Sequence, residues 1–179
     1  NGLEHARRLG LTPDLIVGDF DSCDLGRFSI SEQKLIRYPS EKDDTDTMIA
    51  IKEGIRNGFK EFLFLGCLAG RIDHTIANIQ ALFYLKKRGC NGMLVDENHR
   101  IFLLSCQSME IPRKPGFHLS VLSMGERCEG VTLEQVKYPL KNAVLTNSFP
   151  LGISNEFAAD TAKVTIQKGT ALIVLSRDA

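Results

Sequence analysis

Aspartates follow three apolar runs of the sequence, and their positions predict a shared binding site. Asp19 and Asp21 follow "LIVG", Asp46 lies in the acidic stretch after "LIRY", and Asp73 comes after "EFLFLG". If these runs are strands of an open parallel sheet, the loops after them emerge at one edge, where ligands bind. Asp19 and Asp21 are two residues apart, so an extended segment projects both to the same side. We therefore expect the four carboxylates to surround one crevice.

Carboxylates that converge in this way favour a hard divalent cation. Close like charges raise one another's pKa strongly unless a positive group lies among them. Magnesium prefers oxygen ligands and is commonly shared with substrate phosphates. Asp46 and Asp73 also lie at the expected starts of helices, where a lone aspartate is more often an N-cap than a ligand. The set of four favours Mg²⁺, whereas each helix-start aspartate taken singly favours a cap.

Cations beside these acids fit a phosphate partner. Arg71 follows Gly70 at an expected helix start, and Lys42 supplies a second charge in the acidic stretch. Neither G-x-x-x-x-G-K-[ST] nor G-x-G-x-x-G occurs in the sequence, which argues against a P-loop enzyme and a dinucleotide-binding Rossmann domain. His74 is adjacent to Asp73, but a lone histidine at a helix start is more often structural than a base.

The bulk composition is that of an ordinary globular protein. The 179 residues are 43% hydrophobic and 25% charged, with 22 basic residues against 22 acidic ones. This balance gives no indication of a nucleic-acid or membrane partner. The five cysteines are odd in number and include no C-x-x-C pair, which favours a reducing, cytoplasmic location. No apolar run approaches the length of a membrane span.

Strand and helix patterns alternate in residues 1–104. This alternation predicts an α/β domain with a mainly parallel sheet. Such a domain usually begins with a strand, so we expect a further strand before residue 1. The expected helices cover residues 2–10, 44–57 and 73–88, and the expected strands cover 15–18, 35–38, 61–66, 92–96 and 100–104.

Residues 105–179 have a different pattern, with short alternating runs between Gly, Pro and Asn turns. This is typical of a small all-β sandwich or barrel. The boundary between the two domains is predicted near Ser105. The expected strands cover residues 117–123, 131–136, 141–147, 162–167 and 170–176.

Four motifs together resemble those of the thiamine pyrophosphokinase family. They are "PDLIVGDFDS", "EKDDTDT", "GRIDH" and "GISNEF", and they span residues 13 to 157. The resemblance implies an α/β domain for Mg-ATP over 1–104 and a β-sandwich for thiamine over 105–179. It also implies a homodimer with the site between subunits. The implied reaction transfers the pyrophosphoryl group of ATP to the thiamine hydroxyl, giving thiamine diphosphate and AMP.

The resemblance also implies roles for individual residues. Asp46, Asp73 and Arg71 are the expected catalytic residues, and either aspartate is a candidate to accept the hydroxyl proton. Ser154 and Asn155 are expected to hold thiamine, although Gly, Ser and Asn are also common turn residues. The expected metal ligands are Asp19, Asp21, Asp46 and Asp73. The expected ATP contacts are Asp19, Asp21, Ser22, Lys42, Thr45 and Arg71.

Three other functions are compatible with parts of the sequence. A pyrophosphokinase acting on another acceptor, such as a pterin, would keep the α/β motifs and differ in the β half. A non-catalytic nucleotide- or thiamine-binding protein would not need every motif acid, and all of them are present. A phosphohydrolase with Asp19 as covalent nucleophile leaves the β domain unexplained. The sequence therefore favours thiamine as the acceptor.

Overall fold

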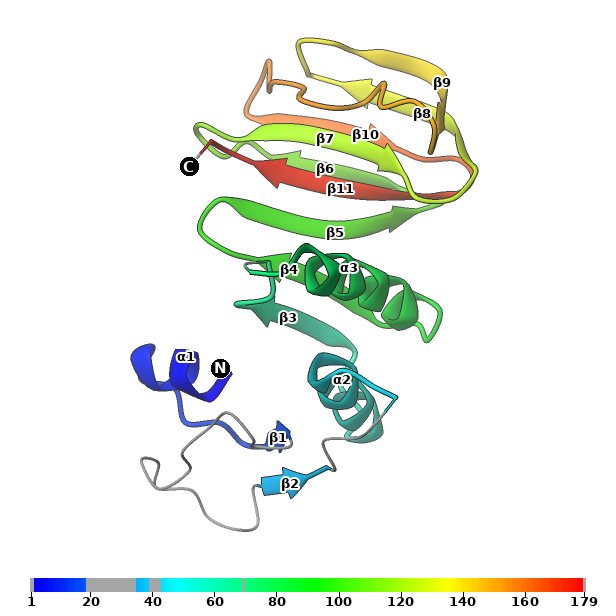
Figure 1. The fold of residues 1–179 in the computed structure, drawn as a ribbon. Helices are drawn as coiled ribbons and strands as arrows, with labels where there is room; N and C mark the ends of the chain where they lie inside the picture. Colours follow the sequence, from blue (N-terminus) through cyan, green and yellow to red (C-terminus); the bar gives the residue numbers. More distant parts are fainter. Residues whose placement is uncertain (1, 19–34, 39–42, 69, 179) are drawn as a thin grey trace. The chain divides into compact units, whose positions relative to one another are not determined.

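The computed structural model describes residues 2–18, 35–38, 43–68 and 70–178 (Figure 1). The chain divides into two compact units, Asn1–Lys60 and Glu61–Ala179, each of which is described by itself. The acids Asp19 and Asp21, together with Ser22 and Lys42, lie outside the described residues.

The first unit contains two short parallel strands and two helices. Strand β1 pairs with β2 in parallel, and Val17 lies opposite Ile36. Helix α2 contacts β1 and buries Ile49 and Ile51. The elements are α1 (Gly2–Arg8), β1 (Ile16–Gly18), β2 (Leu35–Arg37) and α2 (Asp46–Arg56).

The second unit contains one helix and two sheets. A five-stranded sheet has the order β3-β4-β5-β11-β7, and a four-stranded sheet has the order β6-β10-β8-β9. Only the β3–β4 pair of these described strands is parallel. The elements are β3 (Glu61–Leu65), α3 (Ile72–Lys86), β4 (Asn91–Val95), β5 (His99–Ser105), β6 (Ser108–Pro112), β7 (His118–Ser123), β8 (Arg127–Glu134), β9 (Leu140–Thr146), β10 (Thr161–Thr165) and β11 (Thr170–Ser176).

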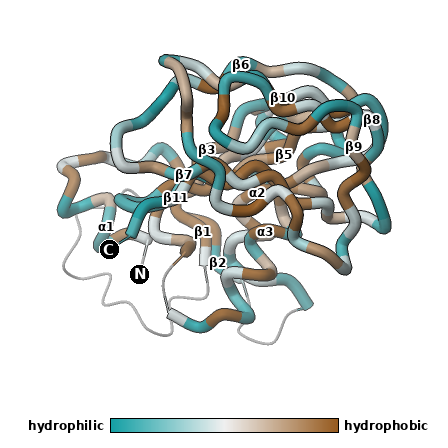
Figure 2. Tube along the Cα trace, turned by 90° about the horizontal axis from the view of Figure 1, so that it is seen from above, coloured by the Kyte–Doolittle hydropathy of each residue, from teal (hydrophilic) through white to brown (hydrophobic). Residues whose placement is uncertain are grey.

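The two sheets of the second unit enclose an apolar core. Alternating residues of β7 and β11 point into it, as expected for strands that bury one face against a second sheet. Figure 2 shows hydrophobic stretches in brown around β5, inside this unit. The core includes Leu104, Phe117, Leu119, Val121, Val131, Leu133, Leu145, Val164 and Ile173.

Helix α3 covers the opposite face of the five-stranded sheet at β4 and β5 (Figure 1). Gly92 on β4 permits this close packing, since a Cβ there would lie 2.7 Å from Leu85 Cδ1. Beyond the last helical residue, Gly89 has φ +67°, and Cys90 N donates to Leu85 O at 3.0 Å. The helix expected over residues 73–88 therefore ends before a glycine in the left-handed region, a common way for a helix to end. The residues buried here are Leu82, Leu94, Ile101, Leu103 and Leu172.

The structure confirms the predicted order of helices and strands and corrects several details. The predicted helices 44–57 and 73–88 are shorter, at Asp46–Arg56 and Ile72–Lys86. Strand β6 was not predicted, because its run is only five residues long and ends in Pro112, although Met109 and Ile111 alternate with exposed residues. The prediction of parallel pairing holds for β1–β2 and β3–β4, whereas β4–β5 and β5–β11 are antiparallel and make the second-unit sheet mixed.

Strand β5 connects the part of the chain with the α/β pattern, residues 1–104, to the part with the all-β pattern, residues 105–179. It was predicted as the last strand of the α/β half, yet it pairs with β11 over seven residues, from Ser105↔Thr170 to His99↔Ser176. One sheet therefore continues from β3 to β7. None of the described helices is long and apolar enough to cross a membrane.

Candidate functional site

The acidic motif "EKDDTDT" leads directly into α2. Thr45 is the N-cap, with an extended backbone, and its Oγ1 accepts a hydrogen bond from Met48 N at 3.2 Å. The alternative that Asp46 caps this helix is therefore wrong. Asp46 is the first helical residue and is exposed, and a carboxylate in that position is favoured by the helix dipole.

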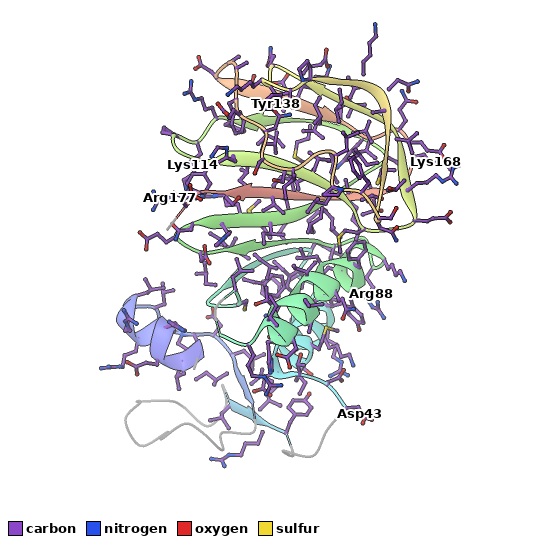
Figure 3. All side chains as sticks on the ribbon, turned by 45° about the horizontal axis from the view of Figure 1, so that its top comes forward. Asp43, Arg88, Lys114, Tyr138, Lys168 and Arg177 are labelled. Atoms are coloured by element: carbon purple, nitrogen blue, oxygen red, sulfur yellow. The ribbon has the colours of Figure 1, made fainter. Side chains whose placement is uncertain are left out.

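The two preceding acids differ in their surroundings. Asp44 Oδ2 lies 2.5 Å from Lys52 Nζ. Lys52 lies about one and a half turns into α2, so the charge of this carboxylate is neutralised by a residue of the same unit. Asp43 is exposed, as Figure 3 shows at the end of the segment before α2. Sequence reasoning did not identify Lys52, which lies on a helix outside every motif.

Tyr38 links β1, β2 and α2 next to the acidic loops. Its backbone N donates to Gly18 O at 3.1 Å, directly before Asp19. Its hydroxyl donates to Glu53 Oε1 at 2.9 Å, and Glu53 is only 8% exposed and also pairs with Arg56. The ends of the segment that carries "EKDDTDT" are therefore tied together.

The motif "GRIDH" forms the start of α3. Arg71 is the N-cap position and makes no side-chain capping bond, while Ile72 is the first helical residue. Arg71 Nε and Nη2 donate to the two oxygens of Asp73, at 3.1 and 2.5 Å. Asp73 Oδ1 also accepts from His74 N at 2.9 Å. The capping alternative for Asp73 is wrong, because its main partner is the Arg71 guanidinium.

This ion pair is open to solvent, and it favours the charged form of both groups. The side chains of Arg71 and Asp73 are 76% and 58% exposed. The hydrogen bond from Arg71 lowers the pKa of Asp73, and the bond to Asp73 raises the pKa of Arg71. Asp73 is therefore ionised at neutral pH and offers oxygen atoms to a cation.

The loop before α3 is held by the helix that follows it. Asn78 Nδ2 donates to Cys67 O at 2.9 Å. Gly66 and Gly70 have φ of +72° and +89°, a region that glycine adopts without strain. These features give the chain the two sharp bends between β3 and Arg71.

The motif "GISNEF" runs along the free edge of β7. Asn155 and Leu119 exchange two backbone hydrogen bonds, of 2.8 and 2.9 Å, and Val121 N donates to Gly152 O at 2.9 Å. A Cβ at Gly152 would lie 2.3 Å from Val121 O, so only glycine allows this approach. The motif is thus a short edge segment of the five-stranded sheet.

Asn155 and Ser154 differ in what their side chains do. Asn155 is 3% exposed; its Oδ1 accepts from Tyr138 N at 2.9 Å, and its Nδ2 donates to Tyr138 O at 2.7 Å. Ser154 is exposed with φ +55°, and its backbone N donates to Ser120 Oγ at 3.0 Å. Both ends of the Asn155 side-chain amide are therefore hydrogen-bonded to the Tyr138 backbone, whereas the Ser154 side chain is exposed to solvent.

A cavity of 300 Å³ adjoins this motif. It is lined by residues 121–123 and 145–152, so its wall ends at Gly152. Three apolar side chains beside it are unusually exposed: Phe149 at 65%, Leu151 at 47% and Ile153 at 56%. This part of the β half can therefore contact an apolar or aromatic molecule.

The structure places some of the predicted site residues and not others. Asp46 and Thr45 belong to the first unit, and Arg71, Asp73, Ser154 and Asn155 to the second. Within the described part of the chain, no three His, Cys, Asp or Glu residues are grouped as for a metal ion. The fourfold aspartate cluster stays a prediction, since two of its members are not described.

Family models match both parts of the chain. Residues 1–94 match the model described as thiamin pyrophosphokinase, catalytic domain. Residues 107–172 match the model described as thiamin pyrophosphokinase, vitamin B1 binding domain. Fold and matches together define an enzyme with a catalytic part and a vitamin-binding part. The chain belongs to the thiamin pyrophosphokinase family.

Individual relatives agree with this assignment. The thiamine pyrophosphokinase of Bacillus subtilis (strain 168) is 28% identical over 173 residues, covering 94% of this chain and 81% of that protein. The crystal structure of a B. subtilis thiamine pyrophosphokinase has a TM-score of 0.89 at 27% identity, over 98% of this chain and 84% of that one. A family protein from Enterococcus faecalis has a TM-score of 0.86 at 31% identity, over 99% and 86%.

Proposed function

We propose that the chain is an ATP:thiamine diphosphotransferase. The thiamine hydroxyl oxygen attacks the β-phosphorus of ATP, the bond from that phosphorus to the α-phosphate oxygen breaks, and AMP leaves. The hydroxyl proton passes to a carboxylate, for which Asp46 and Asp73 are the candidates. The observation that carries this proposal is that one chain matches both a catalytic and a vitamin B1 binding model.

The proposed metal ligands are Asp19, Asp21, Asp46 and Asp73. The described members fit a hard cation, because Asp46 and Asp73 are exposed and Asp73 has a lowered pKa. When bound, Mg²⁺ would supply positive charge beside the phosphates. Asp73 would hold the cation through its carboxylate oxygens, and Arg71, which now pairs with that carboxylate, would contact the phosphates.

Arg71 is the best supported of the proposed ATP contacts. It is 76% exposed, and its planar fork, which already holds one carboxylate, suits phosphate oxygens equally well. Thr45 accepts the Met48 amide but can still donate its hydroxyl proton. The full proposed set is Asp19, Asp21, Ser22, Lys42, Thr45 and Arg71.

Thiamine is proposed to bind at the "GISNEF" segment. Its exposed hydroxyl makes Ser154 the direct contact. Asn155 would act mainly by fixing the Tyr138 backbone, since both ends of its amide bond there. The exposed apolar side chains beside the 300 Å³ cavity offer contacts for the rings.

The remaining parts of the proposal concern organisation. Residues 1–104 would form the Mg-ATP domain with a mainly parallel sheet, and residues 105–179 the thiamine domain. We further propose a cytoplasmic homodimer with the site at the subunit interface. The vitamin B1 binding match favours thiamine over another acceptor such as a pterin, and the catalytic match favours an enzyme over a binding-only protein.

Product analysis tests the reaction. The full chain is incubated with ATP and Mg²⁺, with or without thiamine, and AMP, ADP and thiamine diphosphate are separated by chromatography. We expect AMP to form only with thiamine and in equal amount to thiamine diphosphate. ADP as the product, or AMP formation that does not depend on thiamine, would overturn the proposal.

A further inference from the structure

Three cations surround one aromatic ring at one end of the β sandwich. Lys114 Nζ lies 4.0 Å from the centre of the Phe117 ring, Arg177 Cζ lies 5.5 Å from it, and Arg100 Cζ lies 6.0 Å from it. Phe117 itself is only 5% exposed. Figure 3 labels Lys114 and Arg177 at the same end of this unit.

The sheet register brings the cations together. Arg100 of β5 pairs with Leu175 of β11, and Arg177 follows two residues later and donates its backbone N to Asn98 O at 3.1 Å. Arg100 and Arg177 are therefore diagonal neighbours on one face of the sheet.

A turn places the third cation. Phe117 N donates to Lys114 O at 3.0 Å across Pro115 and Gly116, and Gly116 has φ +77°. Proline followed by a glycine of positive φ is the arrangement of a type II turn. The turn thus brings the Lys114 backbone close to Phe117, and the lysine side chain extends over the ring.

Two of the three charges have no counterion among the residues that the structure describes. Arg177 pairs with Glu97, through Nη2 and Oε1 at 3.2 Å. Among the described residues, Arg100 and Lys114 pair with no carboxylate. Burial lowers the pKa of Lys114, and the charges of Arg100 and Arg177 lower it further. The cluster is thus short of negative charge.

One donor of the cluster is buried without a partner. Nη1 of Arg100 is buried and makes no hydrogen bond with any described residue. A buried charged donor without an acceptor is costly, so native proteins rarely leave one. Contact with the Phe117 ring stabilises each cation but supplies neither an acceptor for this N–H nor a counter-charge.

We propose that Arg100, Lys114 and Arg177, none of which belongs to the four motifs, form a binding site for a phosphate group. A phosphate monoester carries about 1.5 to 2 negative charges at neutral pH, and free phosphate carries more than one, so either approaches the charge of the two cations that have no counterion among the described residues. Its oxygens can accept from the planar forks of the arginines and from the lysine. A singly charged carboxylate would leave one cation unpaired.

Nuclear magnetic resonance of the full chain tests the site. Inorganic phosphate, and separately glycerol 3-phosphate as a monoester, are titrated at constant ionic strength kept with sodium chloride. We expect saturable shifts of the amide signals of Lys114, Gly116, Phe117, His118 and Arg177. Tighter binding of the monoester would indicate a phosphorylated metabolite, and tighter binding of inorganic phosphate would indicate the free ion.

The variants Lys114→Gln and Arg100→Gln/Lys114→Gln should weaken this binding by about tenfold or more, because charge-assisted bonds to the anion are lost. The matched control, Lys141→Gln/Lys168→Gln, removes two exposed charges elsewhere in the β half and should leave it unchanged. Lys114→Gln alone decides the outcome if the double variant fails to fold. Absence of saturable shifts, or equal affinity in Lys114→Gln, would overturn the proposal.

Discussion

The hydroxyl of Tyr38 donates a 2.9 Å hydrogen bond to the buried carboxylate of Glu53 and thereby ties the end of β2 to the middle of α2. The loop between them carries the acidic motif. This contact lies in the first unit and uses residues outside every motif. We therefore expect the Tyr38–Glu53 hydrogen bond to support the loop that carries "EKDDTDT", although neither residue belongs to that motif.

Removal of this support is expected to destabilise the protein. Tyr38→Phe should lower the free energy of unfolding by about 1 kcal/mol, and Glu53→Gln by about 1–3 kcal/mol, because Glu53 also pairs with Arg56. Urea unfolding and kcat/KM measure the two effects. Tyr84→Phe is the control, since no described hydrogen bond involves its hydroxyl. An equal loss in Tyr84→Phe would contradict the supporting role of Tyr38.

Asp73 should be needed for turnover. Asp73→Asn keeps the shape of the side chain but removes the charge, and we expect kcat/KM to fall by about 100-fold or more. Folding should be intact, because the side chain is 58% exposed. Asp160→Asn, an exposed aspartate of the β half, should leave the rate unchanged. Normal turnover of Asp73→Asn would show that this position is no part of the proposed metal site.

The charge of Asp73 should respond to Arg71. The lowered pKa means that the ionised pair is complete at neutral pH and is lost only as the pH falls through the folded-state value, below the ordinary 3.8. In Arg71→Gln the pKa of Asp73 should rise toward that ordinary value. Carbon-13 NMR of the Asp73 carboxyl group measures the titration midpoint in the unaltered chain and in Arg71→Gln. An unchanged midpoint for Asp73 would mean that Arg71 does not set its charge.

The two central residues of "GISNEF" should separate into a ligand contact and a structural one. Ser154→Ala should raise the KM for thiamine and change the free energy of unfolding by less than about 0.5 kcal/mol. Asn155→Ala should cost about 2–4 kcal/mol of stability, because the Tyr138 N–H and C=O lose their partner. Substrate kinetics and urea unfolding distinguish these effects. A Ser154→Ala variant with unchanged KM would remove Ser154 from the site.

Gly152 should tolerate no side chain. Its backbone φ is not positive, so the only obstacle to Ala is the 2.3 Å approach of a Cβ to Val121 O. Gly152→Ala should therefore cost about 2 kcal/mol or more and loosen the motif from the edge of β7. Gly125→Ala is the matched control, since a Cβ there meets nothing within 4 Å. The midpoints of thermal unfolding of Gly152→Ala and Gly125→Ala are compared. Equal midpoints would show that the segment at Gly152 can move away from β7 without loss of stability.

The sequence by itself determined the family, the order of elements and the chemical character of the motifs. These properties depend on short stretches of sequence. Apolar periodicity indicates strands and helices, and the spacing of the acids within each motif indicates the family. The predicted end of α3 before Gly89 is an example, because a helix end depends on a few adjacent residues.

Only the tertiary structure decided the partners of individual side chains. The pairing of β5 with β11 joins residues about 70 apart, and the bonds of Asn155 to Tyr138 join residues 17 apart. The capping alternative for Asp46 and Asp73 fails for a local reason, because each residue lies just inside its helix rather than before it. The physical reason is that hydrogen bonds between distant segments depend on how sheets pack, which local periodicity does not encode.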